Sequence, residues 1–176
     1  MGVALPASFV VDCSIVGAAF LPDEQSPLGA AVREQCAELA LVAPRVLRIE
    51  FLNLALVARR RGRLDDVHFA DMLAQAARFP VQYDEGDTAL AELGRGALQL
   101  GLTSYDYAYL DCAKRRGLPL ATLDRSLLRA CAKAGVETLL VRAGVAPARP
   151  RYPKPATRPR VARASRRGAS ANPTHV

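Results

Sequence analysis

Four acidic residues have the types and positions that metal-ion chemistry requires: Asp12, Glu50, Asp106 and Asp124. Asp12 follows the apolar run "SFVV", and Asp124 follows "LPLAT". Because the carboxyl ends of parallel strands lie on one edge of a sheet, both carboxylates are expected at that edge. Asp106 opens the helix after "GLT" and can reach the same edge. A cluster of carboxylates without histidine or thiolate suits a hard divalent cation such as Mg²⁺ or Mn²⁺.

Glu50 lies in the middle of an expected helix over 45–61. At 100° per residue with Arg48 at zero, Glu50 falls near about 200°, on the side of Ile49 and Leu54. An ionised carboxylate that faces the interior is costly unless a positive charge meets it. No lysine or arginine shares this side of the helix, so a bound cation would resolve the cost.

Three of these acids also have purely structural interpretations. Asp12 and Asp124 each precede a helix and could cap its N-terminus. In "TSYD", Thr103 and Asp106 resemble a capping box. These alternatives stay open for each residue taken alone, but none of them predicts that all four acids should converge.

Other site types are less consistent with the sequence. Asp111 lies about 140° around its helix from Asp106 and can pair with Lys114 or Arg115, which indicates a surface ion pair. No G-x-S-x-G or Cys–His–Asn arrangement is visible, so covalent nucleophilic catalysis is not expected. Ser at position 14 excludes a D-x-D phosphotransferase, and a phospho-accepting receiver domain would need paired early acids and a late lysine.

Strands and helices alternate along the chain. Strands are expected at 8–11, 39–43, 80–83, 118–122 and 137–141. Helices are expected at 26–40, 45–61, 65–79, 87–101, 103–117 and 125–135. This alternation predicts an α/β domain with a parallel sheet and helices on both of its faces.

The net charge of +7 is unevenly distributed. Residues 142–176 hold nine basic residues and no acid, which leaves 15 basic and 17 acidic residues for 1–141. The C-terminal segment is rich in Pro, Arg, Ser and Ala and has little to bury. We therefore expect a folded domain over 1–141 and a disordered basic tail over 142–176, which either solubilises the protein or contacts RNA.

The four cysteines lie far apart and the chain has only two histidines, so no zinc pattern is available. Free thiols in a reducing cytoplasm are expected. The N-terminus lacks the positive region of a signal peptide, and no apolar stretch reaches the length of a membrane span. The sequence therefore predicts a cytoplasmic protein without membrane contact.

Three stretches, taken in order and spacing, resemble one known family: "FVVDCSIVGAAF", "APRVLRIEFLNLAL" and "LTSYDYAYLDCAKRRGLPLATLDRSLLRACAKAGV". They are similar to the PIN-domain ribonucleases that serve as toxins of type II toxin–antitoxin modules, the VapC-like group, over roughly 8–141. The resemblance implies a three-layer α/β/α domain with a short central parallel sheet. It also implies a metal-dependent endoribonuclease that hydrolyses RNA phosphodiester bonds.

The resemblance assigns roles to individual residues. It implies that Asp12 and Asp106 bind Mg²⁺ or Mn²⁺ directly, that Glu50 orients or deprotonates the attacking water, and that Asp124 completes the site. Ser14 and Thr122 match hydroxyl positions that often support such a site. The implied partners are an RNA substrate, a cognate antitoxin protein and a second copy in a homodimer. The alternative is a catalytically inactive PIN fold that binds RNA or protein.

Overall fold

The computed structural model describes residues 5–21, 23–24, 26–86 and 88–139. Within them, the strands form one parallel sheet in the order β3-β2-β1-β4. The strands are β1 (Ser8–Val11), β2 (Ala40–Pro44), β3 (Val81–Asp84) and β4 (Leu120–Ala121). The predicted parallel sheet is therefore confirmed. Of the predicted strand 137–141, the described part contributes an isolated parallel bridge between Leu120 and Thr138.

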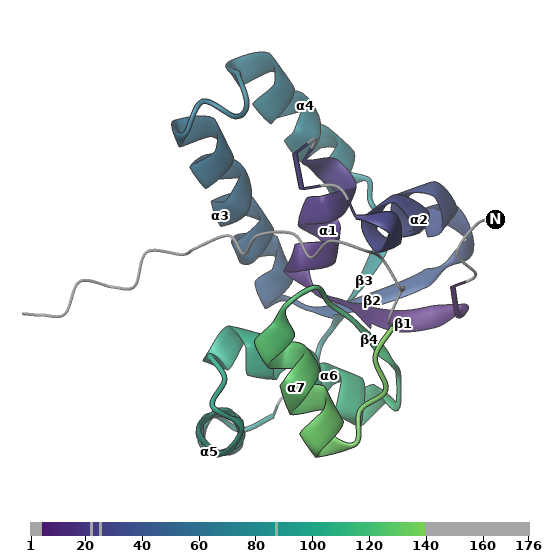
Figure 1. Ribbon diagram of the computed structural model, residues 1–176, viewed down its shortest axis with the longest axis vertical. Coiled ribbons are helices and arrows are strands. Elements are labelled where there is room, and N and C mark those ends of the chain that lie inside the picture. Colours follow the sequence, from purple (N-terminus) through teal and green to yellow (C-terminus); the bar gives the residue numbers. More distant parts are fainter. Residues whose placement is uncertain (1–4, 22, 25, 87, 140–176) are drawn as a thin grey trace, which may run out of the picture.

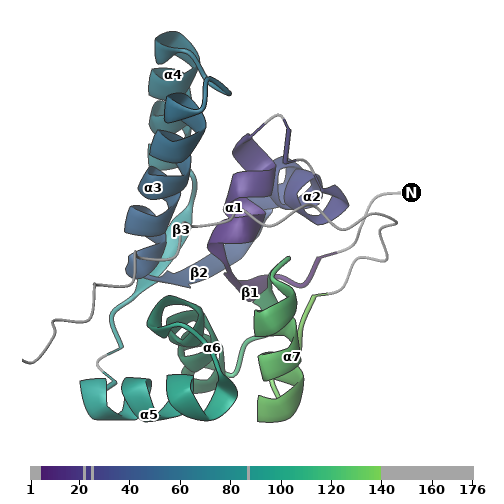
Figure 2. The same ribbon diagram turned by 60° about the vertical axis from the view of Figure 1, so that its left-hand side comes forward.

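Helices cover both faces of this sheet (Figure 1, Figure 2). On one side lie α1 (Cys13–Phe20), α2 (Pro27–Gln35), α3 (Val46–Arg60) and α4 (Asp66–Ala77). On the other side lie α5 (Leu90–Leu100), α6 (Ser104–Arg116) and α7 (Arg125–Ala134). The molecule is the predicted three-layer α/β/α domain.

The central strand β1 explains why the sheet needs both helix layers. Phe9, Val10 and Val11 are all fully buried, so both faces of the strand are covered. A continuous apolar run is the pattern expected for a strand buried on both sides. Its two neighbours align with it in register, and Val11 lies opposite Ala121 of β4. This pairing brings the residues that follow β1 and β4 to the same edge of the sheet.

The helix predicted over 26–40 is shorter in the structure. Ser26 accepts the backbone N–H of Gly29 at 2.9 Å, so the predicted cap and the following proline do start α2. The helix ends at Gln35 and is followed by a 3₁₀ turn, Cys36–Glu38. The backbone of Ala40 is needed for the sheet, where its N–H donates to the carbonyl of Ala7 at 2.8 Å. Tertiary pairing thus shortens a helix that periodicity alone would extend.

The inner face of α3 differs from the prediction. Ile49 is 68% exposed and does not face the interior. The buried residues of the helix are Leu47, Phe51, Leu54, Ala55 and Ala58. Glu50 is half-buried at the margin of that face. The prediction for Ile49 was wrong because only a narrow stripe of this helix packs against the rest of the domain. An apolar side chain beside that stripe can therefore remain exposed.

Two further predictions concern the C-terminal tail and membrane-spanning helices. The tail predicted to be disordered, 142–176, lies outside the described residues. Among the residues that the structure describes, no helix is long and apolar enough to cross a bilayer.

Candidate metal centre

Asp12 stands where β1 ends and α1 begins, but its side chain does not cap the helix. The backbone carbonyl of Asp12 accepts the N–H of Ile15 at 3.0 Å, while the carboxylate makes no capping hydrogen bond. The residue is only 6% exposed. Its Oδ2 atom accepts the hydroxyls of Ser14 at 2.7 Å and Thr122 at 2.6 Å. The structure therefore does not support the capping alternative for the Asp12 carboxylate.

The two hydroxyls fix Asp12 to the loop that follows β4. Ser14 Oγ accepts the backbone N–H of Leu123 at 2.9 Å, and Thr122 Oγ1 accepts that of Asp124 at 3.0 Å. Each hydroxyl has one proton, and both protons point to the Asp12 carboxylate because the backbone N–H groups occupy the acceptor side. The arrangement favours the ionised form of Asp12 and holds its orientation.

Glu50 is tied to the opposite helix layer by Tyr109. Tyr109 of α6 is fully buried, and its hydroxyl donates to Glu50 Oε2 of α3 at 2.5 Å. This bond joins two helices that lie on different faces of the sheet (Figure 1). Tyr109 was not predicted from the sequence. Its signal was a polar phenol three residues after Asp106, on the same side of an otherwise apolar helix face.

Burial and mutual repulsion act together on these acids. Burial raises the pKa of Asp12, against the hydroxyls of Thr122 and Ser14, and the charge of Asp106 raises it further. Burial also raises the pKa of Glu50 to about 7, against the hydrogen bond from Tyr109, with Asp12 and Asp106 adding to the rise. The structure thus brings Asp12, Glu50 and Asp106 into electrostatic reach of one another.

Asp106 and Asp124 each take part in a helix cap, as their structural alternatives predicted. Thr103 Oγ1 accepts the N–H of Asp106 at 3.0 Å and donates to its Oδ2 at 2.8 Å. Asp124 Oδ1 accepts the N–H groups of Ser126 at 2.6 Å and Leu127 at 3.0 Å. The caps use one carboxylate oxygen of each residue, Oδ2 of Asp106 and Oδ1 of Asp124. The hydrogen-bonded path from Asp124 to Asp12 runs through Thr122.

The donors at this edge fit a hydrated hard cation. Among the described residues, no group of three or more His, Cys, Asp and Glu side chains stands ready to hold a metal ion. Mg²⁺ needs fewer, because it keeps several waters and usually takes only one or two carboxylates. Burial, helped by the charges of Asp12 and Glu50, raises the pKa of Cys13 well above its usual range, so that thiol stays protonated in the metal-free protein. The remaining donors are oxygens, and a divalent cation would relieve their repulsion.

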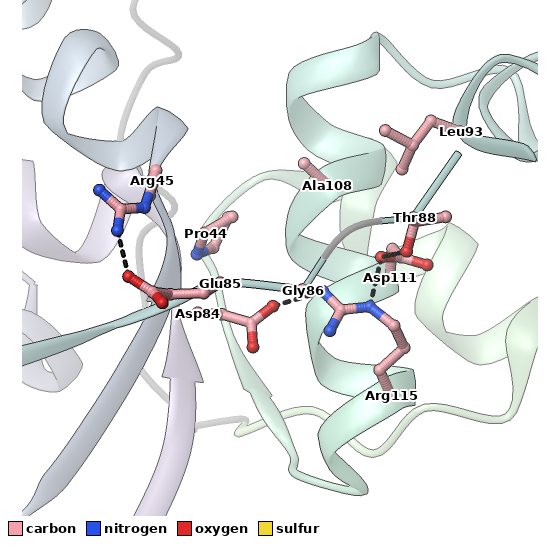
Figure 3. A pocket seen from close by; sticks show the side chains of 10 residues that line it. All are labelled: Pro44, Arg45, Asp84, Glu85, Gly86, Thr88, Leu93, Ala108, Asp111 and Arg115. Atoms are coloured by element: carbon pink, nitrogen blue, oxygen red, sulfur yellow. Dashed lines mark hydrogen bonds and ion pairs between the residues drawn. The ribbon is translucent and has the colours of Figure 1, made fainter. Parts of the chain in front are cut away.

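A second group of carboxylates lies farther along the same edge, and its buried member Asp84 was not predicted. β3 ends on Asp84, which is 6% exposed and forms ion pairs with Arg115 and, at 2.8 Å, with Arg116. These guanidinium groups, Arg115 above all, lower the pKa of Asp84 to about 2. Figure 3 shows the Asp84 carboxylate in contact with the Arg115 guanidinium. Both residues line a pocket of about 380 Å³. Here the chain itself supplies the compensating positive charge.

Asp111 belongs to this second group. Its carboxylate accepts a hydrogen bond from Arg115 Nε at 2.8 Å, which confirms the predicted pairing with Arg115. The predicted surface position is wrong, because the Asp111 side chain is only 14% exposed and also accepts the Thr88 hydroxyl at 2.8 Å (Figure 3). A Cβ atom at Gly86 would lie 1.9 Å from Arg115 Nη1, so the missing side chain of Gly86 makes room for the guanidinium.

Comparison with known proteins identifies a matching family model, a similar curated protein and similar solved structures. A family model described as PIN domain matches residues 9–133, the segment that contains Asp12, Glu50, Asp106 and Asp124. Ribonuclease VapC3 of Pyrobaculum aerophilum is 31% identical over 120 residues, which are 67% of this chain and 90% of that protein. The crystal structure of PAE2754 from Pyrobaculum aerophilum aligns with a TM-score of 0.51 at 27% identity, over 70% of this chain and 84% of that one.

Proposed function

Because the chain belongs to the PIN-domain family, we propose that it is a metal-dependent endoribonuclease and the toxin of a toxin–antitoxin pair. The observation that carries the proposal is the environment of the Asp12 carboxylate. Its buried carboxylate serves no helix cap, receives two hydroxyl hydrogen bonds, and lies within electrostatic reach of Glu50 and Asp106. The ribonuclease name of the curated relative from Pyrobaculum aerophilum supports the same reaction.

Asp12 and Asp106 are the proposed direct ligands of Mg²⁺ or Mn²⁺. When bound, the ion would lower the pKa of a water ligand and stabilise negative charge on the phosphate during in-line attack. Ser14 and Thr122 orient the Asp12 carboxylate for this role, and their hydrogen bonds oppose the rise in its pKa that burial causes. Asp124 completes the site from a position that its own helix cap fixes.

Glu50 is the proposed proton acceptor. A group that must accept a proton at neutral pH works best when its own pKa lies near that pH. Burial brings the pKa of Glu50 to about 7, and the hydroxyl of Tyr109 holds one of its oxygens. The other oxygen is then the one that orients or deprotonates an attacking water.

The proposed partners are an RNA substrate, an antitoxin protein and a second copy of the chain. Arg125 is exposed beside Asp124 and is a candidate for contact with an RNA phosphate. Large apolar side chains are exposed on two helices, with Ile49 of α3 at 68% and Leu90 and Leu98 of α5 at 87% and 85%. Such side chains are typical of surfaces that bind other proteins.

A second candidate function is an inactive PIN fold that only binds RNA or protein. One observation favours it: within the described parts of the chain, no three potential ligands stand ready to hold a metal ion. A degenerate nuclease would keep the fold and lose that capacity.

The two candidates are separated by incubating the purified protein with structured RNAs in Mg²⁺, in Mn²⁺ and in EDTA. Asp12→Asn is compared with Asp71→Asn, which changes an exposed acid of α4 in the same way. We expect cleavage that requires the metal and is lost in Asp12→Asn but kept in Asp71→Asn. Metal-dependent cleavage at the full rate by Asp12→Asn would contradict the assignment. If the unaltered protein cleaves no RNA, and Asp12→Asn and Asp71→Asn bind RNA equally well, the result would favour the inactive fold.

A further inference from the structure

The exposed face of α7, the helix that lies beside α6 (Figure 1), carries a line of positive charge. Arg125, Arg129 and Lys133 are all exposed and follow one another at intervals of four residues. At 100° per residue, the three side chains lie within about 80° of one another around the helix axis and are spread over about 12 Å of its length. The helix contains no acidic residue. We call these three residues the α7 stripe.

The α7 stripe begins at the edge of the sheet where the candidate metal centre lies. Arg125 directly follows Asp124, whose backbone N–H donates to Thr122 Oγ1 at 3.0 Å. Thr122 in turn donates to the buried carboxylate that follows β1. Arg129 lies one turn farther along, and its Nη2 donates to Ser126 Oγ at 3.2 Å, so its guanidinium leans toward the N-terminal end of α7. Two of the three cations therefore stand at the end of the helix that adjoins the acids.

The folded domain does not use these charges in ion pairs. Within the described residues, the ion-paired arginines are Arg45, Arg59, Arg63, Arg115 and Arg116. No ion pair in this part of the chain includes a member of the α7 stripe. Arg125 also stands in the first turn of α7, where the helix macrodipole disfavours a positive charge. Ion pairing therefore does not account for the stripe, and helix stability does not account for Arg125.

RNA needs positive charge near the acids in order to bind there. Asp12, Glu50 and Asp106 repel a phosphate backbone, and a bound divalent ion would offset only part of their charge. Residues 1–141 hold 15 basic and 17 acidic residues, so they have no excess of positive charge. The α7 stripe supplies three cations without carboxylate partners, in one line that starts next to Asp124.

We propose that the α7 stripe binds phosphates of the RNA strand that passes through the acid site, so that the strand leaves this site along α7. The proposal rests on RNA being the substrate of the proposed function. Contacts to phosphates position a strand without reading its bases, so the stripe would orient RNAs of different sequence in the same way. Such contacts also make affinity depend on salt, because each of them releases counterions.

The test uses the full chain with Asp12→Asn, so that binding is measured without cleavage. In the stripe variant, Arg125, Arg129 and Lys133 are all changed to Gln. In the control variant, three exposed arginines at the C-terminal ends of α3 and α4 are changed to Gln, namely Arg60, Arg61 and Arg78. Both variants lose the same net charge. Their affinity for a labelled single-stranded RNA is measured by fluorescence anisotropy in EDTA at several KCl concentrations.

The control arginines are remote from the acids. Arg60 follows Glu50 by ten residues on α3, which is about 15 Å along the helix axis. Arg78 precedes β3, so it lies near the opposite edge of the sheet. The two variants therefore differ in where the charge is removed and not in how much.

We expect the stripe variant to bind RNA at least about 10-fold more weakly in moderate salt, and its salt slope to fall by about 2, because three phosphate contacts are lost. The control variant should change affinity by less than about 2-fold. A third variant, Arg125→Lys with Arg129→Lys, keeps the positive charges and should recover most of the affinity.

Two results would overturn the proposal. Equal losses of affinity in the stripe and control variants would mean that net charge alone explains binding. Unchanged RNA affinity in the stripe variant would mean that RNA does not contact this face, and would point to a protein with acidic side chains as its partner.

The outcome is independent of catalysis. If the protein with Asp12 intact cleaves no RNA but the stripe variant loses affinity as described, the RNA-binding stripe is supported and the nuclease is rejected. If cleavage occurs and the stripe variant binds as well as the control, the nuclease is supported and the RNA-binding stripe is rejected.

Discussion

Two groups of carboxylates lie on the same edge of one sheet and have opposite electrostatics. In the first, the acid cluster of Asp12, Glu50 and Asp106, burial and mutual repulsion raise the pKa of Asp12 and bring that of Glu50 to about 7. In the second, the ion-pair network of Asp84 and Asp111 with Arg115 and Arg116, the pKa of Asp84 falls to about 2.

The difference lies in the source of positive charge. Asp12 directly follows β1, Asp84 is the last residue of β3, and both are 6% exposed, so residue type, place at a strand end and exposure do not distinguish them. Asp84 receives two guanidinium groups from α6, whereas the groups that bind the Asp12 carboxylate are neutral hydroxyls. Removing a buried carboxylate from its ion pairs leaves uncompensated positive charge and destabilises the fold. A buried carboxylate held by hydroxyls beside other acids is suited to a cation from solution.

The largest expected difference between the two groups is in RNA cleavage. Asp12→Asn should lower the cleavage rate in Mn²⁺ by on the order of 100- to 10,000-fold, since it removes a proposed metal ligand. Asp84→Asn should lower it by less than about 10-fold at a temperature where the variant is fully folded. Initial rates on one RNA measure both. Similar losses in the two variants would remove the functional distinction between the groups.

The hydroxyls that hold Asp12 should matter next. Thr122→Val removes the 2.6 Å hydrogen bond to Asp12 and the acceptor for the Asp124 N–H, and we expect a loss of about 10- to 100-fold in cleavage rate. Thr122→Ser keeps the hydroxyl and should recover most of the activity. The pair of variants is compared by cleavage rate and by Mn²⁺ dependence. Full activity in Thr122→Val would mean that the hydroxyl only supports the fold.

For stability we expect the reverse order, with a larger effect from changing Asp84 than from changing Asp12. Asp84→Ala leaves Arg115 and Arg116 without their buried partner and should lower the free energy of unfolding by about 2 kcal/mol, less than for fully buried pairs because both arginines are partly exposed. Asp12→Asn should leave the metal-free protein within about 0.5 kcal/mol of the unaltered one, since it removes a repulsive charge from the acid cluster. Urea unfolding in EDTA measures both variants. A larger loss in Asp12→Asn than in Asp84→Ala would contradict the comparison.

The smallest expected effect is a pH dependence from Glu50. Its pKa is about 7 in the folded protein and 4.5 ordinarily, so the folded state holds the proton more tightly. The contribution to stability is complete below about pH 4.5 and is lost as the pH rises through about 7. Relative to Glu50→Gln, the metal-free protein should lose roughly 1 kcal/mol of unfolding free energy between about pH 5 and pH 8, a figure reduced for the partial exposure of Glu50. Parallel stability curves for the two proteins would show that Glu50 has an ordinary pKa.

The fold was largely predictable because its signals are local. Apolar runs for strands, and a serine or threonine before a helix, depend on neighbouring residues and are read directly from the sequence. The error over 36–40 arose where strand pairing of Ala40 overrides helical periodicity. The exposure of Ile49 was missed for a similar reason, because periodicity gives the angle of a residue on its helix but not the width of the packed stripe.

The candidate site was predictable in its acids and less so in their partners. Asp12 and Asp106 are marked by their places after a strand and at a helix start. The hydrogen bond between Tyr109 and Glu50 joins residues 59 positions apart, and no local sequence pattern predicts this contact. Asp84 was missed because its significance comes from Arg115 and Arg116 of a distant helix. Which acid is paired and which is not depends on the tertiary structure.

The most direct test of the account is the binding of Mn²⁺ to the metal-free protein, measured by electron paramagnetic resonance. The unaltered protein and Asp84→Asn should bind Mn²⁺ with equal affinity, while Asp12→Asn should bind at least about 10-fold more weakly. This result would establish that the acid cluster draws its positive charge from solution. Equal binding by Asp12→Asn and the unaltered protein would contradict the claim that these carboxylates form a metal centre.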